Sequence, residues 1–423
     1  MNAQISFLDG TLSLIHIPLD LYSHFLQSIL QVLLPQSQPL GADGRSPDLE
    51  GLEGLTIDNQ HGFLNISVTP IECSIVCHSS WSKNVFEPAI KRLPKELAKT
   101  VSISKDSYVV LSVISAGMDA GSRVVDLTSP LALAGIPIFF ITTYYSDFIL
   151  VPTKDRQSVV KALLARGFVF SEDESSFKTP GPSSSSSAHS RGPSQSSGNS
   201  VDPPSTPPPS SLGELQTRAF DTLRKRNVVP YIEPGLRLVQ CSGREDSGIS
   251  GSYSEQMRRN RSRHNSNSQS GFGGSSGLAG GGSGQDGGWH GGHGTSWVDT
   301  VDTKLYTSII SALVSQPRFL SVTLAQDDPP SLLLDKSLLR IFGDSLVGPT
   351  ADDGNLVPIF LDLVSLPFEA TGIVSGVAGR LVQDLQMMES AELSYLSTAR
   401  AGAVILAHRE SERALEILKG GVQ

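Results

Sequence analysis

The 423-residue sequence contains little cysteine, few aromatic residues and little charge. Three cysteines are too few for a disulfide framework in a chain of this length, which favours a reducing compartment. Aromatic residues make up 6% of the chain and charged residues 18%, and the net charge is −9. Because a nucleic-acid binder needs a basic face to displace counterions, the acidic balance excludes general nucleic-acid binding.

The N-terminal segment lacks the pattern of a targeting or membrane-spanning segment. No basic residue precedes its apolar stretch, which Asp9, His16, Asp20 and His24 interrupt. A signal peptide needs a basic region before an apolar core, and a spanning helix needs about 20 mostly apolar residues. We therefore expect a cytoplasmic protein without a membrane span.

Glycine and proline, in contrast, are abundant, at 40 and 26 residues. Many of them gather in residues 172–212, rich in serine and proline, and in residues 242–297, rich in glycine and serine. Such segments bury too little apolar surface to offset an ordering cost of roughly 1–2 kcal/mol per residue. We predict that both segments are disordered insertions.

The rest of the chain repeats one order of elements, namely strand, helix, strand, strand, helix. Apolar runs, helical spacing of apolar residues and β-rich arms around a turn predict this order twice. YLST and ILA of the second copy stand where FITT and ILV stand in the first, which indicates a divergent internal repeat. The first copy comprises a strand at 108–115, a helix at 122–134, a hairpin at 136–152 and a helix at 154–165. The second copy comprises a strand at 357–364, a helix at 372–387, a hairpin at 392–408 and a helix at 409–419.

Looser versions of the same pattern precede each copy. Residues 5–17 are predicted as a strand-rich run and 19–34 as a helix, and the glycine-rich insertion falls between a strand at 235–241 and a helix at 301–314. We therefore predict an α+β fold of four related units, paired as two halves. The predicted units are residues 1–100, 101–171, 213–348 (containing the insertion 242–297) and 349–423, with 172–212 as a linker.

This order of elements resembles the ACT regulatory domain, so that the fold would be four tandem ferredoxin-like ACT domains. The stretch TTYYSDFILVPTKDRQSVVKAL is more closely similar to the CASTOR family of cytosolic arginine sensors. Members of that family carry a Tyr-x-x-Asp-Phe-Ile-Leu-Val hairpin, which Tyr144 and residues 147–151 match. Residues 368–374 and 395–398 resemble the family's last loop and the strand that follows. The resemblance covers roughly residues 5–171 and 226–420, without the insertion.

The resemblance implies an amino-acid site where the second and fourth units meet. The Pro137 and Ile138 backbone would face the ligand from one side, and residues 367–372 would wrap its charged ends from the other. A helix start at 371–373 also offers free N–H groups that favour a carboxylate, although every loop between a strand and a helix does so. The expected ligand-binding residues are Pro137, Ile138, Pro367, Phe368, Glu369, Thr371, Gly372, Ile373 and Gly402.

One of these positions departs from the family. The acidic residue that pairs with the arginine guanidinium in the family is replaced here by Gly402, and Arg400 adds a like charge nearby. A buried guanidinium without its carboxylate would lose a charge-assisted hydrogen bond. The sequence therefore favours a different amino acid, or no ligand, over arginine.

The resemblance also implies a partner surface. In the family, the hairpin turn contacts the complex that relays nutrient state to the TOR kinase, and Tyr144, Tyr145 and Asp147 stand at that turn here. An exposed turn with two tyrosines suits an interface, because tyrosine is enriched at binding hot spots. The alternative is a hairpin in which Asp147 only binds the turn amides. The oligomeric state stays open, with a homodimer as one option.

Three motifs that resemble chemical sites are incomplete. Residues 342–346 spell the Gly-Asp-Ser-Leu block of an esterase family, but the Asp-x-x-His pair that such enzymes need does not follow. Cys73, Cys77 and His78 have the spacing of neither a zinc site nor a haem attachment site. The glycine tract lacks the Gly-Lys-Ser/Thr end of a phosphate-binding loop. We predict no catalytic residue, no metal and no cofactor.

The insertions contain candidate phosphorylation sites. Ser262 and Ser266 each follow an arginine by three residues, and Thr179 and Thr206 each precede a proline. Chain without stable structure suits a kinase because it enters the active site in extended form.

The sequence thus predicts a non-catalytic regulatory protein that binds an amino acid and reports it to a protein partner, by resemblance in TOR nutrient signalling. The ligand would bridge the two halves and thereby hide or expose the hairpin at 144–147. The alternative is a regulatory subunit or allosteric ACT module of an amino-acid biosynthetic enzyme, with aspartokinase-like regulation. An esterase built on Ser345 is the weakest hypothesis.

Overall fold

The computed structural model describes residues 3–34, 62–114, 121–171, 209–244, 302–326, 328–348, 355–385 and 392–422. The two predicted insertions therefore lie outside the described residues, except at their edges. There, residue 212 begins a helix and residues 242–243 end a strand. The four candidate phosphorylation sites also lie outside the described residues.

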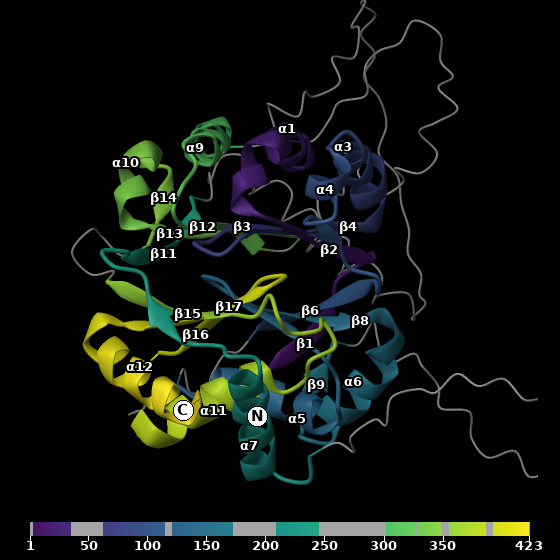
Figure 1. Cartoon of the computed structure of the whole chain (residues 1–423), viewed down its shortest axis with the longest axis vertical. Helices are drawn as coiled ribbons and strands as arrows, with labels where there is room; N and C mark the ends of the chain where they lie inside the picture. The colour runs from purple at the N-terminus through teal and green to yellow at the C-terminus, as the bar shows by residue number, and fades with distance from the viewer. Residues whose placement is uncertain are drawn as a thin grey trace, which may run out of the picture.

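Two broad sheets face each other, and helices cover the outer side of each (Figure 1). In the first sheet the strands are ordered β5-β2-β4-β3-β12-β13-β11-β14, with every pair antiparallel. Its strands are β2 (Leu12–Ile17), β3 (Phe63–Val68), β4 (Cys73–His78), β5 (Ser102–Ile103), β11 (Leu238–Gly243), β12 (Leu320–Ala325), β13 (Asp328–Asp335) and β14 (Leu346–Val347).

In the second sheet the order is β9-β1-β6-β8-β7-β16-β17-β15-β10, and only the β1–β9 pair is parallel. Its strands are β1 (Gln4–Phe7), β6 (Tyr108–Ile114), β7 (Phe139–Thr142), β8 (Asp147–Pro152), β9 (Val169–Phe170), β10 (Tyr231–Ile232), β15 (Leu356–Asp362), β16 (Ser394–Ser397) and β17 (Ala401–Ala407). Two further pairs join the two sheets at their rims, β2 with β6 and β11 with β15. The strand pairings therefore form a closed circuit.

The helices fall into two outer layers, one on each sheet (Figure 1). Those on the first sheet are α1 (Tyr22–Leu33), α2 (Ser79–Trp81), α3 (Glu87–Lys91), α4 (Lys95–Ala98), α9 (Thr303–Val314) and α10 (Leu339–Phe342). Those on the second sheet are α5 (Arg123–Leu133), α6 (Arg156–Leu164), α7 (Leu212–Lys225), α11 (Ile373–Leu385) and α12 (His408–Val422). Among the described residues, none of these helices combines the length and the apolar character that crossing a bilayer requires.

Four groups of elements share one connection order. They begin with β2, β6, β11 and β15, and each continues with a helix, two antiparallel strands and a further helix. In each group the third strand lies between the first and the second, as β8 lies between β6 and β7. The β3–β12 pair joins the first and third groups in one sheet, and the β7–β16 pair joins the second and fourth groups in the other.

Alternation of side chains explains how the sheets pack. In β2, Ile15 and Ile17 face the helices of the first sheet, while Leu12 and Leu14 face the second sheet. In α1, Phe25, Ile29 and Val32 recur at helical spacing and lie buried against the same sheet. The apolar core therefore has three layers, one between the sheets and one under each set of helices. Full burial of one such side chain contributes about 1.5–3 kcal/mol.

The N-terminal segment differs from the prediction that residues 5–17 form one strand-rich run of the first unit. The structure divides this run between the two sheets, because β1 pairs with β6 and β2 pairs with β4. Gly10, whose φ of +95° suits a residue without a Cβ atom, lies in the turn between them. Residues 4–7 therefore extend the sheet of the second group.

Candidate functional site

A small pocket lies where the fourth group meets the second, at the start of α11. Its volume is about 50 Å³. Because roughly 10–15 Å³ of such space holds one water molecule, the pocket holds a few waters or a ligand of similar size. The lining residues are Ile138, Phe139, Leu363, Leu366, Pro367, Phe368, Ala370, Ile373, Val374, Tyr395, Ser397, Thr398, Ala399 and Ala401.

The loop between β15 and α11 forms most of one wall. Its start is fixed by a hydrogen bond from the Leu363 amide to the Arg400 carbonyl, at 2.8 Å. Its end is Gly372, with φ of +79°, after which α11 begins at Ile373. The N–H groups of the first helical turn have no partner within the helix, so the helix start favours a carboxylate there.

The predicted ligand-binding residues divide into two sets. Ile138, Pro367, Phe368 and Ile373 line the pocket. The other five are not among the lining residues, although each adjoins a lining residue in the sequence or lies under one in the sheet. These five are Pro137, Glu369, Thr371, Gly372 and Gly402.

Sequence analysis missed Tyr395, which stands over Gly402. The Tyr395 side chain is 1% exposed, and its buried hydroxyl has no hydrogen-bond partner among the described residues. A Cβ atom added at Gly402 would lie 2.6 Å from that hydroxyl oxygen, so only glycine leaves room for the ring. Burial raises the pKa of Tyr395 well above its ordinary value, which keeps the hydroxyl protonated. The sequence offers one clue to this residue, because Tyr395 precedes Ser397 by two residues and therefore lies on the same face of β16.

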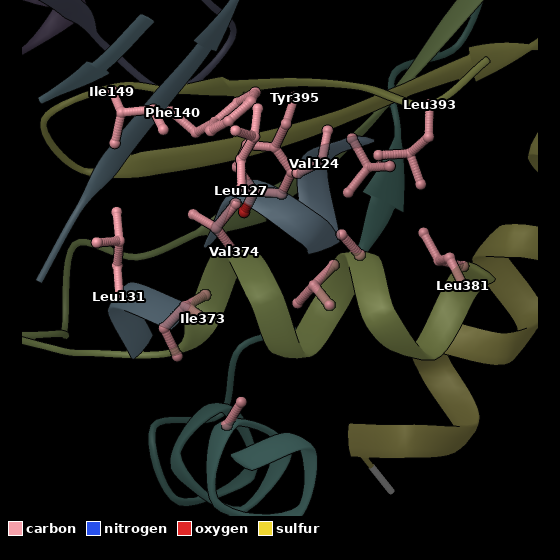
Figure 2. Close-up of a cluster of buried hydrophobic side chains, with 14 of the residues drawn as sticks. Val124, Leu127, Leu131, Phe140, Ile149, Ile373, Val374, Leu381, Leu393 and Tyr395 are labelled. Atoms are coloured by element: carbon pink, nitrogen blue, oxygen red, sulfur yellow. The ribbon is translucent and has the colours of Figure 1, made fainter. Parts of the chain in front are cut away.

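The ring of Tyr395 points from β16 toward α11 (Figure 2). Ile373 and Val374, the first residues of that helix, line the pocket together with Tyr395. The Tyr395 ring therefore lies between the sheet and the helix start.

The β7–β8 hairpin has the same register as the β16–β17 hairpin but different side chains. Thr142 pairs with Asp147 as Ser397 pairs with Gly402, so Asp147 occupies the place of Gly402. By the same register Phe140 occupies the place of Tyr395. Asp147 is 1% exposed, and its carboxylate lies 2.7 Å from Nε of Arg123 at the start of α5. Burial raises the pKa of Asp147 to about 6, and Arg123 opposes that shift.

The predicted partner surface at this hairpin is therefore only partly exposed. Asp147 is buried, contrary to the expectation of an exposed turn, and it pairs with Arg123 rather than only with turn amides. Thr143 closes the turn instead, through a hydroxyl that donates to the Ser146 carbonyl at 2.7 Å. Tyr145 is 50% exposed and lies edge-on to the half-buried Tyr144.

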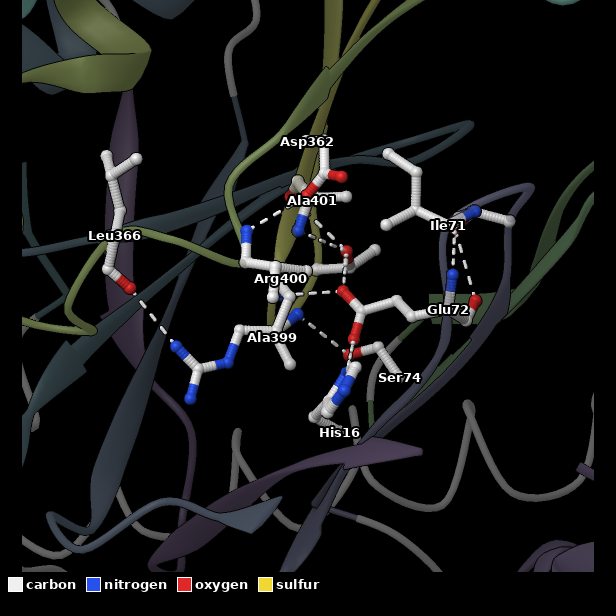
Figure 3. Close-up of polar contacts among 12 residues, drawn as sticks. His16, Ile71, Glu72, Ser74, Asp362, Leu366, Ala399, Arg400 and Ala401 are labelled. Atoms are coloured by element: carbon white, nitrogen blue, oxygen red, sulfur yellow. Dashed lines mark hydrogen bonds and ion pairs between the residues drawn. The ribbon is translucent and has the colours of Figure 1, made fainter. Parts of the chain in front are cut away.

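A buried glutamate links the turn between β16 and β17 to the first sheet (Figure 3). Glu72, in the turn between β3 and β4, is fully buried. One of its carboxylate oxygens accepts hydrogen bonds from the Thr398 hydroxyl and the Arg400 amide, and the other lies 2.5 Å from Nδ1 of His16. Sequence analysis did not identify Glu72, because no local motif surrounds it.

Arg400 extends this network to the pocket. Its guanidinium donates to the Leu366 carbonyl at 3.1 Å (Figure 3). The guanidinium also lies over the ring of Phe368, 4.0 Å from the centroid. Leu366 and Phe368 both line the pocket. Arg400 thus contacts the loop between β15 and α11 (the pocket loop, residues 363–372) through its side chain, and Glu72 through its amide.

The incomplete motifs occupy structural positions. Ser345 is buried, and its hydroxyl donates to the Phe342 carbonyl at 2.7 Å, in a turn after α10. Cys73 and Cys77 are free and buried, and burial raises the pKa of Cys77 to about 12. In the part of the chain that the structure describes, no group of three or more His, Cys, Asp or Glu side chains could hold a metal ion.

Comparison with known proteins identifies one segment. A family model described as an ACT domain matches residues 103–165, a span from the end of β5 to the end of α6. No curated protein matches the chain.

Among solved structures, the chain is similar to a protein from Agrobacterium tumefaciens, with 20% identity and a TM-score of 0.24 over 40% of this chain and 92% of that chain. It is also similar to a putative C-terminal regulatory domain of aspartate kinase from Porphyromonas gingivalis, with 14% identity and a TM-score of 0.24. That match covers 40% of this chain and 96% of the regulatory domain.

A further similar structure is the aspartate kinase from Synechocystis, with 9% identity and a TM-score of 0.29. That match covers 99% of this chain but 56% of the kinase. With every one of these TM-scores below 0.5, the conclusion rests on the family match alone. The chain contains an ACT domain at residues 103–165.

Proposed function

We propose that this chain is a non-catalytic regulatory protein that binds an amino acid in the pocket at the start of α11 and reports it to a protein partner. The observation that carries the proposal is the position of the pocket. It lies where the matched ACT domain joins, edge to edge, a fourth group with the same connection order. ACT domains bind amino acids, most often at the interface between two domains.

The proposal includes tandem ACT domains. The groups that begin with β2, β11 and β15 share the strand order of the matched group, which supports assigning them to the same fold. Pairing of β7 with β16 and of β3 with β12 then forms two pairs of domains, one pair per sheet.

The start of α11 is the proposed carboxylate site of the ligand. The amides of a first helical turn and the helix dipole favour an anion there, and Gly372, with φ of +79°, ends the loop directly before this turn. The position at which the family resemblance expects an acidic partner is Gly402, covered by the Tyr395 ring. The site therefore lacks the carboxylate that an arginine side chain would need.

Contacts of Arg400 offer a route by which the bound state reaches the rest of the molecule. A ligand that moves Leu366 or Phe368 changes the contacts of the Arg400 side chain, and the Arg400 amide binds Glu72 of the first sheet. The β7–β8 hairpin also contacts the first sheet, through the Tyr144 amide and the Ser331 hydroxyl at 2.9 Å. We assign the exposed Tyr145 as the partner contact and, by the family resemblance, a TOR nutrient-signalling complex as the partner.

Thermal unfolding of the full chain in the presence of each of the twenty amino acids tests the proposal. A ligand at a hundred times its Kd stabilises the folded protein by about 2.7 kcal/mol, which raises the Tm measurably. Ala370→Leu places a larger side chain in the pocket and should abolish the shift. Ser365→Leu, on an exposed part of the same loop, is the matched control and should retain it. If no amino acid raises the Tm of the wild-type chain, the proposal is wrong.

A further inference from the structure

The start of α5 has the same place in the second group of elements as the start of α11 has in the fourth group. Both helices bury apolar residues in one core at matching positions, namely Val124, Leu127 and Leu131 in α5 and Val374, Val377 and Leu381 in α11. At this spacing Arg123 corresponds to Ile373, and each is the first residue of its helix. Because Ile373 lines the pocket, Arg123 stands at the equivalent position of the second group.

Each helix start also adjoins a strand of the other group. At the start of α11, the pocket wall includes Ile138, which directly precedes β7. The equal register of the two hairpins makes Leu393, directly before β16, the counterpart of Ile138. Its neighbour Glu392 approaches Arg123 at the start of α5. The two places are therefore related by the pairing of the second and fourth groups.

A guanidinium fills the place at the start of α5. Nε of Arg123 lies 2.7 Å from Oδ2 of Asp147, and Nη2 lies 3.8 Å from Oε1 of Glu392. One carboxylate belongs to the second group and the other to the fourth, so the guanidinium bridges the junction. Asp147 holds the register position of Gly402. A carboxylate buried there needs a cation, because an isolated buried charge is costly.

Solvent reaches the outer side of this guanidinium. The Arg123 side chain is 14% exposed and that of Glu392 is 61% exposed, whereas Asp147 is 1% exposed. The guanidinium thus lies between a solvated carboxylate at the rim and a buried carboxylate at the inner end. Truncation of Arg123 would open a path from the surface to Asp147.

We propose that the start of α5 is a second recognition site of the junction, built for a guanidinium cation and filled by Arg123 as a ligand from the same chain. Its ligand class is an alkylguanidinium, whose planar, delocalised cation suits a carboxylate better than an ammonium does. Of the two related places, the pocket at α11 is open and the place at α5 is occupied. The inference concerns a different site from the proposed function and does not depend on it.

Thermal unfolding of the full-length Arg123→Ala variant with methylguanidinium tests the inference. Methylguanidinium reproduces the head of the missing side chain, and roughly 20 mM is far below the molar range in which guanidinium salts denature proteins. At ten times its Kd the cation should raise the Tm of Arg123→Ala by about 2–3 °C, and the rise should saturate. The wild-type Tm should not rise, because Arg123 occupies the site.

Controls separate recognition from general effects of the added salt. Sodium chloride at the same concentration supplies the ionic strength, and urea supplies the planar shape without the charge. Neither should raise the Tm of Arg123→Ala. The double variant Arg123→Ala/Asp147→Asn has lost the buried charge and should not respond to methylguanidinium. An equal rise in the single and the double variant, or with sodium chloride, would show that the cation acts elsewhere, and the inference would be wrong.

The test also holds if Arg123→Ala does not fold by itself. Methylguanidinium should then restore the far-ultraviolet circular dichroism of the wild type, while the double variant should fold without it because no unpaired charge is buried. If the double variant folds and methylguanidinium does not rescue Arg123→Ala, the inference is wrong.

One further variant separates the two places. Ala370→Leu fills the pocket at α11, so Arg123→Ala/Ala370→Leu should still respond to methylguanidinium. Loss of the response would place the cation in the α11 pocket and would overturn the inference. The proposed function is decided separately, by the response of the wild-type chain to the twenty amino acids.

Discussion

The β7–β8 and β16–β17 hairpins pair with each other in the middle of the second sheet and have the same register and the same turn. They differ in the aromatic residue that faces the helices and in the residue that lies beneath its ring. In both, a threonine amide closes the turn by donating to a carbonyl three residues on, at 2.9 Å. One hairpin carries Phe140 and Asp147, and the other carries Tyr395 and Gly402. The first site is filled by Arg123, while the second adjoins a pocket. A single carboxylate thus distinguishes a hairpin with an internal ion pair from a hairpin that adjoins a pocket.

Replacement of Arg123 should have the largest effect on stability. Arg123→Ala leaves the buried Asp147 carboxylate without its partner, and removal of one member of a buried ion pair costs about 3–5 kcal/mol. Urea unfolding at neutral pH measures the loss. The control is Arg380→Ala on α11, whose i,i+4 pair with Asp384 is partly exposed and should contribute less than about 1 kcal/mol. Equal losses in the two variants would show that the internal ion pair does not stabilise the β7–β8 hairpin.

The dependence of stability on pH should differ between wild type and Asp147→Asn. Burial holds the pKa of Asp147 at about 6, above its ordinary value of 3.8, so between these values the folded protein binds more protons than the unfolded chain. This contribution to stability is complete below pH 3.8 and is lost as the pH rises through 6. Two pKa units correspond to roughly 3 kcal/mol.

Urea unfolding of both proteins from pH 4 to pH 7.5 isolates this contribution, because other titrating groups are common to both. The wild-type free energy of unfolding, relative to that of Asp147→Asn, should fall as the pH rises across this range. Parallel curves would show that the pKa of Asp147 is the same in the folded and unfolded chain.

The two hairpins also show which features of the structure the sequence predicts and which it does not. The two hairpins follow from alternation and turn composition, and the junction of the second and fourth units follows from a family resemblance. The burial of Asp147 depends on Arg123, which belongs to another element, so the residues around Tyr144 could not reveal it. The buried position of the Tyr395 ring depends on Gly402, which has no side chain to occupy the same space.

Long-range contacts account for the other differences. Glu72 binds Thr398 and Arg400, which lie near the opposite end of the chain. No local sequence pattern indicates such a contact. The division of residues 5–17 between two sheets depends on β6, whose free edge accepts β1. Periodicity describes which face of a strand is buried, but not which sheet the strand joins.

The turns of the two hairpins also differ in how they contact the first sheet, and this provides the smallest expected effect. The β16–β17 turn binds the Glu72 carboxylate, whereas the β7–β8 turn binds the Ser331 hydroxyl through the Tyr144 amide. Hydrogen bonds to a charged group contribute about 1.5–3 kcal/mol, and neutral ones about 0.5–1.5 kcal/mol. Glu72→Gln should therefore lower the free energy of unfolding more than Ser331→Ala does, as measured by urea unfolding at one pH. Equal effects would mean that the charge of Glu72 adds nothing to the contact between the sheets. The proposed route from the pocket loop through Arg400 to the first sheet would then lose its main energetic support.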